Sequence, residues 1–277
     1  MRTAASALLV IIALLVAAVA GPSLWLQRNI IDEAGFAKLA GPLGGNAEFQ
    51  GGLTELVSSR ATAALNLTPP FSDLAASLVT SAAQQIYTDP AYEPAWTQTL
   101  ERSHRLTFAA AETSGTAADV KLDIAPIVGM VIGNVSEQVG IPVPLPPELV
   151  VDVEQPELAR LLPAATTLGG WGPWLAGIAV ALIVLALVVA KRRAATTIFL
   201  GVGLAVVALG WWLAAGMVQT GLRQQMAGPA AIETLGVELG ALAGESWQKG
   251  ITATFIVAAV LLVAGVVALM VGNRRTT

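Results

Sequence analysis

The chain contains no cysteine and only one histidine among its 277 residues. Without cysteine it can form no disulfide, no thiolate metal site and no cysteine nucleophile. A single histidine cannot build a multi-histidine zinc site. A phosphate-binding glycine-rich loop and a Gly-x-Ser-x-Gly motif are also missing. The sequence therefore predicts no catalytic residues, no metal and no cofactor.

Charged residues are scarce, and acidic residues are missing from most of the chain. Charged side chains make up 12% of the sequence, where a soluble domain carries about 25%. The nineteen acidic residues occur only between Asp32 and Glu157 and between Glu233 and Glu245. Basic clusters lie elsewhere, at Arg2, at 191–193 and at 274–275. Because no basic cluster lies in the acidic segments, nucleic-acid binding is not expected.

Four apolar stretches separate these charged segments, which predicts a multi-pass protein of the plasma membrane. Lysine and arginine are retained on the cytoplasmic side, so both termini should be cytoplasmic and the large acidic segment extracytoplasmic. The expected layout is a first transmembrane helix at 1–26, an extracytoplasmic domain at 27–170, a three-span membrane domain at 171–273 and a cytoplasmic tail at 274–277. The three later spans are expected at about 174–190, 198–215 and 251–271, with an outer loop at 217–249.

The first apolar stretch has two interpretations. Ala18-Val19-Ala20 before Gly21 fits a signal-peptidase site. However, apolar residues continue through Trp25 and Leu26, which favours a retained anchor. Both interpretations place the following segment outside.

Tryptophan supports the same topology on different physical grounds, because its ring prefers the headgroup region. Six of the seven tryptophans lie at the predicted outer ends of spans, at positions 25, 171, 174, 211, 212 and 247. The spans contain no charged residue, which argues against a pump or a proton-coupled transporter. Small residues four apart, such as Gly177 with Ala181 and Gly201 with Ala205, are expected to provide ordinary helix packing.

The extracytoplasmic segment is predicted to be mainly helical. Asn46 should cap a first helix that ends before Pro69-Pro70, and Ser72 or Asp73 should cap a second that ends at Asp89-Pro90. A third helix is expected at about 92–111, a short one at 126–139, and another beginning near Pro156.

Two short strands are predicted in the same segment. Apolar and charged residues alternate over 120–124, and a second strand is expected at 149–154, pairing with the first. The acidic residues on these strands, Asp119, Asp123, Asp152 and Glu154, could form a patch, but a solvated strand face is expected rather than a calcium site. The fold class is therefore membrane α-helical: a four-span bundle with a mainly α extracytoplasmic domain that contains a short two-stranded β element.

The third helix carries the candidate contact surface, which consists of Trp96, Glu101, His104 and Arg105. His104 is spaced by four residues along a stripe with Trp96, Leu100 and Phe108, so a buried core position is the favoured interpretation. Glu101 and Arg105, also four apart, are expected to pair within the helix rather than bind an anion.

The chain resembles a family of uncharacterised integral membrane proteins of actinobacteria. The resemblance rests on Trp96 to Ala111, on Val120-Lys121-Leu122-Asp123-Ile124-Ala125-Pro126 (similar to the family's V-x-L-D-L-x-P), on Gly140-Ile141 and on the turn at 191–193. The family has no assigned activity, so the resemblance implies a topology and no mechanism.

The favoured function is a non-enzymatic cell-envelope protein whose extracytoplasmic domain binds a protein partner or a surface component. One alternative is an accessory subunit of a larger membrane complex, respiratory or export. Another is a membrane-embedded enzyme that acts on lipid or cell-wall intermediates, with His104 and Glu101 at its site.

Overall fold

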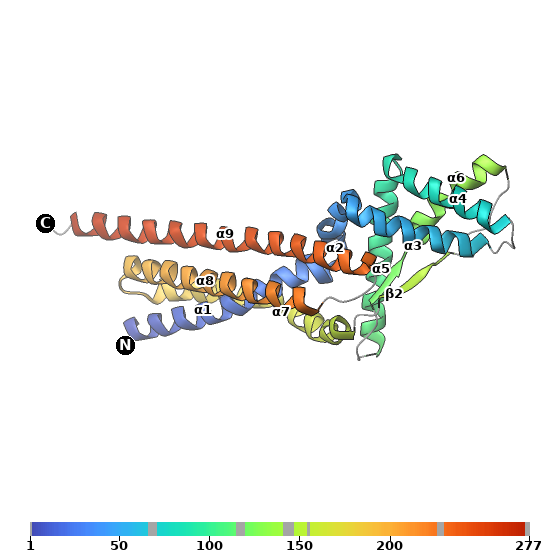
Figure 1. Cartoon of the computed structure of the whole chain (residues 1–277). Coiled ribbons are helices and arrows are strands. Elements are labelled where there is room, and N and C mark those ends of the chain that lie inside the picture. Colours follow the sequence, from blue (N-terminus) through green and yellow to red (C-terminus); the bar gives the residue numbers. More distant parts are fainter. Residues whose placement is uncertain are drawn as a thin grey trace. The chain divides into compact units, whose positions relative to one another are not determined.

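A computed structural model describes residues 2–65, 71–114, 120–140, 147–153, 156–225 and 230–274. The described chain is almost entirely helical, with one pair of strands (Figure 1). In chain order the elements are α1 (Arg2–Leu26), α2 (Glu33–Ala40), α3 (Ala47–Leu65), α4 (Phe71–Gln85), α5 (Tyr92–Ser114), β1 (Val120–Asp123), α6 (Ala125–Val139), β2 (Val150–Val153), α7 (Pro156–Val189), α8 (Arg193–Gln225) and α9 (Ala230–Arg274).

The chain divides into two compact units. One, here called the apolar unit, consists of Met1–Arg28, Thr166–Gln225 and Ala243–Thr277. The other, here called the acidic unit, consists of Asn29–Ala165 and Met226–Leu242. The predicted boundary at residue 170 thus lies a few residues inside the apolar unit, because α7 continues through it as one helix.

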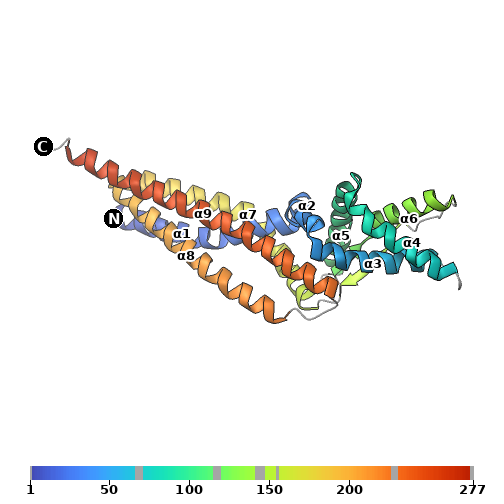
Figure 2. The same ribbon diagram turned by 45° about the horizontal axis from the view of Figure 1, so that its top comes forward.

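Within the described residues, four helices are long and apolar enough to cross a membrane, namely Thr3–Ile31, Arg160–Val189, Arg193–Met217 and Gly236–Val271, and most of each lies in the apolar unit. These helices run alongside one another (Figure 2). Most of their large side chains, such as Val180, Phe199 and Val260, point outward. Apolar side chains facing outward along whole helices suit lipid as the surrounding solvent. The number and length of the helices suggest a multi-pass membrane protein.

Small residues bring these helices close together. A Cβ atom added at Gly172 would lie 2.8 Å from the backbone of Leu24, where α7 meets α1. At Gly201 it would lie 2.9 Å from the carbonyl oxygen of Ala258, where α8 meets α9. Gly201 therefore packs within the bundle as expected, whereas a Cβ atom added at Gly177 would meet no neighbouring atom within 4 Å.

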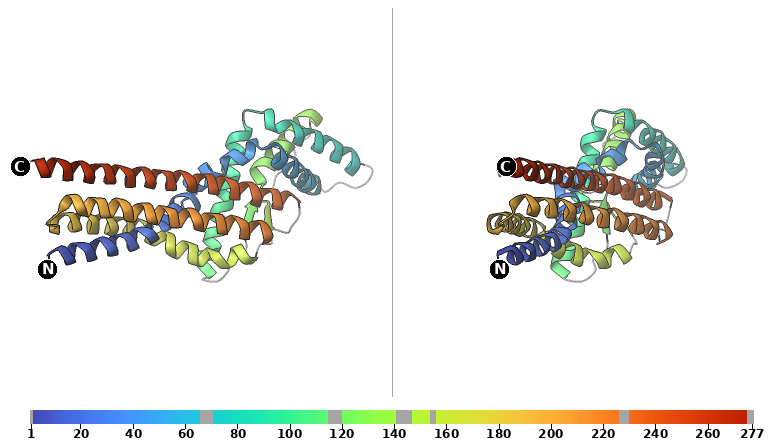
Figure 3. Two further views of the ribbon diagram at one scale, coloured as in Figure 1. Left: turned by 60° about the vertical axis from the view of Figure 1, so that its left-hand side comes forward. Right: turned by 90° about the vertical axis from the view of Figure 1, so that its left-hand side faces the viewer.

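The two ends of the apolar unit differ in chemistry. The start of α1, the turn between α7 and α8 and the end of α9 lie together at one end (Figure 3). Toward the other end three tryptophans meet: Trp247 contacts Trp25 and Trp211 with ring centroids 5.7 and 5.6 Å apart. Trp211 also donates to the carbonyl oxygen of Ala18 (2.9 Å). The basic turn at 191–193 and the tryptophan cluster therefore lie toward opposite ends of one bundle.

The stretch predicted as an outer loop at 217–249 is largely helical where the structure describes it. α8 continues to Gln225 and α9 begins at Ala230, and residues 226–229 lie outside the described part. The predicted span ends were set by loss of hydrophobicity, but a helix can continue into water when its backbone hydrogen bonds are kept. Pro163 likewise lies inside α7 without ending it.

Local signals in the acidic unit explain where its helices begin and end. The Asn46 side chain accepts from the backbone N–H groups of Glu48 and Phe49 (2.9 and 3.0 Å), as predicted for an N-cap. α6 ends at Gly140, whose φ of 74° is a left-handed conformation that favours glycine. α4 begins at Phe71, so Ser72 and Asp73 lie inside its first turn and not at the N-cap position where they were predicted. The Pro69-Pro70 break lies outside the described residues.

The core of the acidic unit lies between α3, α4, α5 and α6. Its largest fully buried side chains come from different elements and include Val57, Val79, Ile86, Trp96, Ile124, Ile127 and Ile132. Leu239 and Leu242 of α9 also pack against this core. The unit is therefore completed by a segment that is distant in sequence.

The strand prediction is confirmed. β1 and β2 pair antiparallel, with Val120 opposite Val153 and Asp123 opposite Val150. The expectation of a solvated acidic face was wrong for Asp123, which is 1% exposed. Asp119 and Glu154 lie outside the described residues.

Candidate functional site on α5

Helix α5 contacts α2, α6 and β1 and is the central element of the acidic unit. Trp96 lies on its buried face, where the indole N–H donates to the carbonyl oxygen of Gly41 (3.1 Å). The ring packs over Gly44, where an added Cβ atom would lie 2.6 Å from Cδ1 of Trp96. Only glycine leaves room for the indole there, so Trp96 fixes α5 against the 3-10 turn at Gly41–Gly45.

His104 lies two turns further along the same face. Its ring stacks on Phe108 (centroids 4.3 Å apart) and contacts Phe36 (5.3 Å). Nε2 lies 2.9 Å from the carbonyl oxygen of Ile30, and because a carbonyl can only accept, Nε2 carries the proton. The favoured interpretation of His104 as a buried core residue is therefore confirmed.

A polar cluster beside His104 fixes β1 to α5. The Ser103 hydroxyl accepts from the Asp123 backbone N–H (2.9 Å), and the Thr107 hydroxyl accepts from that of Lys121 (3.0 Å). These two N–H groups lie on the edge of β1 that β2 does not cover. Hydroxyls of α5 thus satisfy donors that burial would otherwise leave unpaired.

The side chain of Asp123, at the end of β1, contacts α5, α6 and the residue that precedes β2. Its Oδ1 accepts from the backbone N–H groups of Ala125 and Leu149 (3.1 and 3.0 Å), at the start of α6 and just before β2. Its Oδ2 lies 3.7 Å from Nη1 of Arg102, which also donates to the carbonyl oxygen of Pro147 (3.2 Å). The Asp123 carboxylate is therefore buried, its negative charge lies beside the positive charge of Arg102, and its role is structural.

The predicted pairing of Glu101 with Arg105 was wrong. Arg105 instead forms a hydrogen-bonded ion pair with Glu33 of α2. Arg102 is likewise occupied by Asp123 and Pro147. Both cations of this stretch of α5 therefore have partners inside the unit, and Glu101 forms no ion pair within the described residues.

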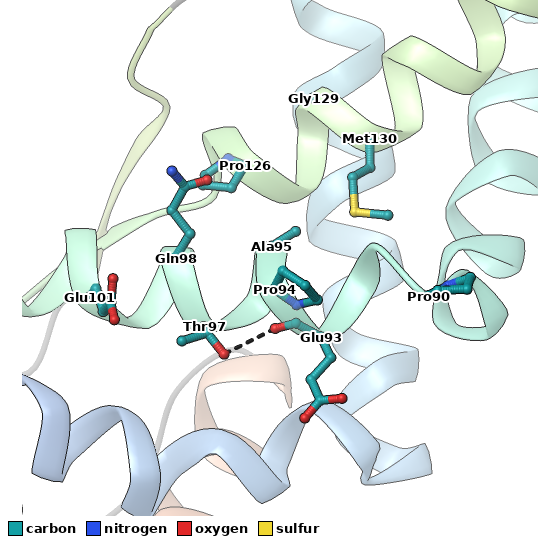
Figure 4. A pocket seen from close by; sticks show the side chains of 10 residues that line it. All are labelled: Pro90, Glu93, Pro94, Ala95, Thr97, Gln98, Glu101, Pro126, Gly129 and Met130. Atoms are coloured by element: carbon teal, nitrogen blue, oxygen red, sulfur yellow. Dashed lines mark hydrogen bonds between the residues drawn. The ribbon is translucent and has the colours of Figure 1, made fainter.

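An open hollow of about 990 Å³ lies between α5 and the start of α6. Figure 4 shows Gln98 and Met130 directed toward the space between the two helices, whereas Glu93 and Thr97 extend from the side of α5 that faces away from α6 in this view. Proline, alanine and methionine supply its apolar lining. The described residues that line it are Pro90, Glu93, Pro94, Ala95, Thr97, Gln98, Glu101, Pro126, Gly129 and Met130. Among these residues there are two carboxylates and no cation.

The chemistry of this hollow suits a protein surface better than a small substrate. It is open to solvent, whereas small-molecule sites enclose most of their ligand. His104 is not among the described residues that line it, whereas Glu101 is. Among the described residues, no three His, Asp or Glu side chains lie where they could hold a metal ion.

The structure separates the four predicted contact residues. Trp96 and His104 are buried at 2% and 7% exposure, while Arg105 pairs with Glu33. Only Glu101 lines the hollow. Glu93 was not among the predicted contact residues, although Glu93, Thr97 and Glu101 repeat every four residues on the predicted helix. No sequence pattern indicated Pro126 and Met130, because only the packing of α6 on α5 places these two residues beside the hollow.

Comparison with protein-family models, with curated proteins and with solved structures found no match for this chain.

Proposed function

We propose that this protein is a multi-pass envelope membrane protein whose acidic unit is extracytoplasmic and binds a cationic surface of a protein partner through the hollow between α5 and α6. The observation that carries the proposal is the separation of charge between the two units. The acidic unit has six basic and eighteen acidic residues, a net charge of −12, whereas the apolar unit has nine basic residues and one acidic. Membership of the actinobacterial family stays a prediction.

The orientation follows from that separation. Lysine and arginine near span ends favour the cytoplasmic side. The α7–α8 turn carries Lys191, Arg192 and Arg193, and it lies at the same end of the apolar unit as the start of α1 and the end of α9. Both termini are therefore assigned to the cytoplasm and the acidic unit to the outside.

The chemistry of the partner follows from the hollow. Glu93 and Glu101 have no ion pair among the described residues, while Arg102 and Arg105 are held by partners inside the unit. The negative charge of the hollow attracts and orients a positively charged partner. The apolar side chains that line the hollow can then be buried against that partner. A cationic protein surface fits both properties.

The orientation can be tested by cysteine labelling, because the chain has no native cysteine. Glu55→Cys on α3 and Arg192→Cys in the α7–α8 turn both replace exposed residues. A membrane-impermeant maleimide should label the first in intact cells and the second only after the bilayer is opened. Labelling of Arg192→Cys in intact cells with protection of Glu55→Cys would reverse the assignment.

The partner can be tested by placing a photo-crosslinking amino acid at Gln98 in the full-length protein in cells. We expect one dominant adduct, much weaker when the crosslinker replaces exposed Glu55 on α3. Combining the Gln98 crosslinker with Glu93→Gln and Glu101→Gln should reduce the adduct several-fold, because the attraction of the hollow for cations is lost.

The matched control is Glu48→Gln with Glu137→Gln, which removes two exposed carboxylates outside the hollow. The adduct should persist in that variant. An equal loss in both variants would show that only the overall charge matters, and a partner without a basic surface would contradict the proposal. Co-migration of the adduct with a large assembly on a native gel would identify the protein as an accessory subunit.

A further inference from the structure

The end of the apolar unit that carries the α7–α8 turn is basic and exposed. Lys191, Arg192 and Arg193 are consecutive and all exposed. α1 begins at Arg2 and α9 ends at Arg274 at this same end (Figure 3). The only acidic residue of the apolar unit, Glu245, pairs instead with Lys249 (2.9 Å). Within the described residues, the three cations of the turn form no ion pair.

The turn also lies at the depth of lipid phosphates. Trp211 follows Arg193 by 18 residues on α8, which corresponds to about 27 Å of helix. That length is close to the hydrocarbon thickness of about 30 Å. If the tryptophans mark one headgroup region, the turn lies in the other. Cations there face phosphate groups rather than hydrocarbon or bulk water.

We propose that Lys191, Arg192 and Arg193 form a binding site for the phosphate of an anionic lipid headgroup. The first turn of α8 contributes as well: it contains no acidic residue, and its first backbone N–H groups have no partner within the helix. A zwitterionic headgroup carries a compensating cation that the three basic side chains would repel. The site therefore selects lipids with a net negative charge.

The test uses the full-length protein in a mild neutral detergent, titrated with phosphatidylglycerol and separately with phosphatidylcholine, with bound lipid counted by native mass spectrometry. We expect phosphatidylglycerol to bind preferentially and to dissociate as salt rises. At about 1 kcal/mol for each basic residue, Lys191→Gln with Arg192→Gln and Arg193→Gln should weaken binding roughly a hundredfold.

Two further variants keep the result interpretable. Lys38→Gln with Arg60→Gln and Lys249→Gln removes three exposed cations elsewhere and should bind phosphatidylglycerol like the parent. Arg192→Lys with Arg193→Lys keeps the charge and should bind within a fewfold of the parent, even if the glutamine variant fails to fold. Loss of binding in the lysine variant would overturn a charge-based site.

Two results with the parent protein would also overturn the proposal. One is equal binding of phosphatidylcholine and phosphatidylglycerol. The other is full competition by inorganic phosphate at the concentration of the lipid, which would assign the site to free phosphate. Neither result bears on partner binding by the acidic unit, and failure of the Gln98 crosslink would leave this site untouched.

Discussion

At the scale of single residues, the structure reassigns polar side chains from function to architecture. Asp123 looked like part of a solvated acidic strand, yet it is buried and accepts two backbone N–H donors beside Arg102. His104 is held between two phenylalanines and a backbone carbonyl. Glu93, which is exposed, and Glu101, which is half-buried, have no ion pair among the described residues and remain as candidates for contact with a partner.

Asp123→Ala should destabilise the acidic unit by about 3 kcal/mol, because it leaves two buried N–H groups and Arg102 without their acceptor. Asp123→Asn keeps one accepting oxygen and should lose less. The free energy of unfolding can be measured by urea titration of the detergent-solubilised protein. As a control, Asp152→Asn on the exposed side of β2 should stay within about 0.5 kcal/mol of the parent. Equal effects at both positions would contradict the structural role of Asp123.

The two tyrosines of the chain should resist ionisation in the folded protein. Burial raises the pKa of Tyr87 above its usual value of 10.0, and a hydrogen bond with Thr54 offsets part of that rise. Burial, and then the neighbouring Tyr87, raises the pKa of Tyr92. Phenolate absorbance should therefore appear at higher pH in the folded protein than in denaturant.

The corresponding stability has a definite sign. The folded state keeps protons that the unfolded state loses near pH 10, so this contribution is complete below pH 10 and is lost as the pH rises toward the folded-state pKa values. An alkaline titration followed by absorbance, in native buffer and in denaturant, measures both states. Coinciding titration curves would refute the burial of these side chains.

At the scale of elements, small residues determine which helix faces can meet. A Cβ atom at Gly201 would meet the backbone of α9, while one at Gly177 would meet open space. Both glycines belong to small-residue pairs of the same spacing in the sequence. Only the positions of the helices distinguish the face used for packing from the face directed outward.

Gly201→Ala should therefore destabilise the bundle, by about 1–3 kcal/mol, since the Ala258 carbonyl and the Leu262 nitrogen cannot move aside without shifting α9. Gly177→Ala should be neutral or slightly stabilising, because alanine is the better helix former. Unfolding by a denaturing detergent, monitored by tryptophan fluorescence, compares the two. If Gly177→Ala proves the more damaging, the contact between α8 and α9 is misassigned.

At the scale of the whole molecule, the acidic unit is discontinuous in sequence. Its main part, Asn29–Ala165, is joined by the stretch Met226–Leu242. Leu239 and Leu242 of that stretch pack against the core of the acidic unit. The segment predicted as an outer loop is in part a helix that completes the domain.

Leu239→Ser with Leu242→Ser should consequently lower the stability of the acidic unit by about 2 kcal/mol, because both apolar contacts are replaced by polar groups. Hydrogen exchange of α3 and α5 in the full-length protein would report the loss. Val237→Ser, at a position 45% exposed, is the control and should leave exchange unchanged. Unchanged exchange in the double variant would show that the stretch adds nothing to the core.

The sequence by itself determined which segments are long and apolar enough to cross a membrane, and it determined several helix boundaries. Apolar runs of span length define the four long helices, and Asn46 and Gly140 act through their own neighbouring backbone. Such effects depend on a few consecutive residues, so the sequence contains them. The same reasoning placed Val120–Asp123 and Val150–Val153 in paired strands.

The tertiary structure alone decided which side chains meet. It paired Arg105 with Glu33 instead of Glu101, buried Asp123 and separated Trp96 and His104 from the surface. It also brought Pro126 and Met130 opposite Glu101, forming the hollow. These contacts join residues far apart along the chain, and their energies depend on packing that no local pattern encodes. Of the four predicted contact residues, only Glu101 therefore lies at the hollow, although the helix that carries all four was predicted.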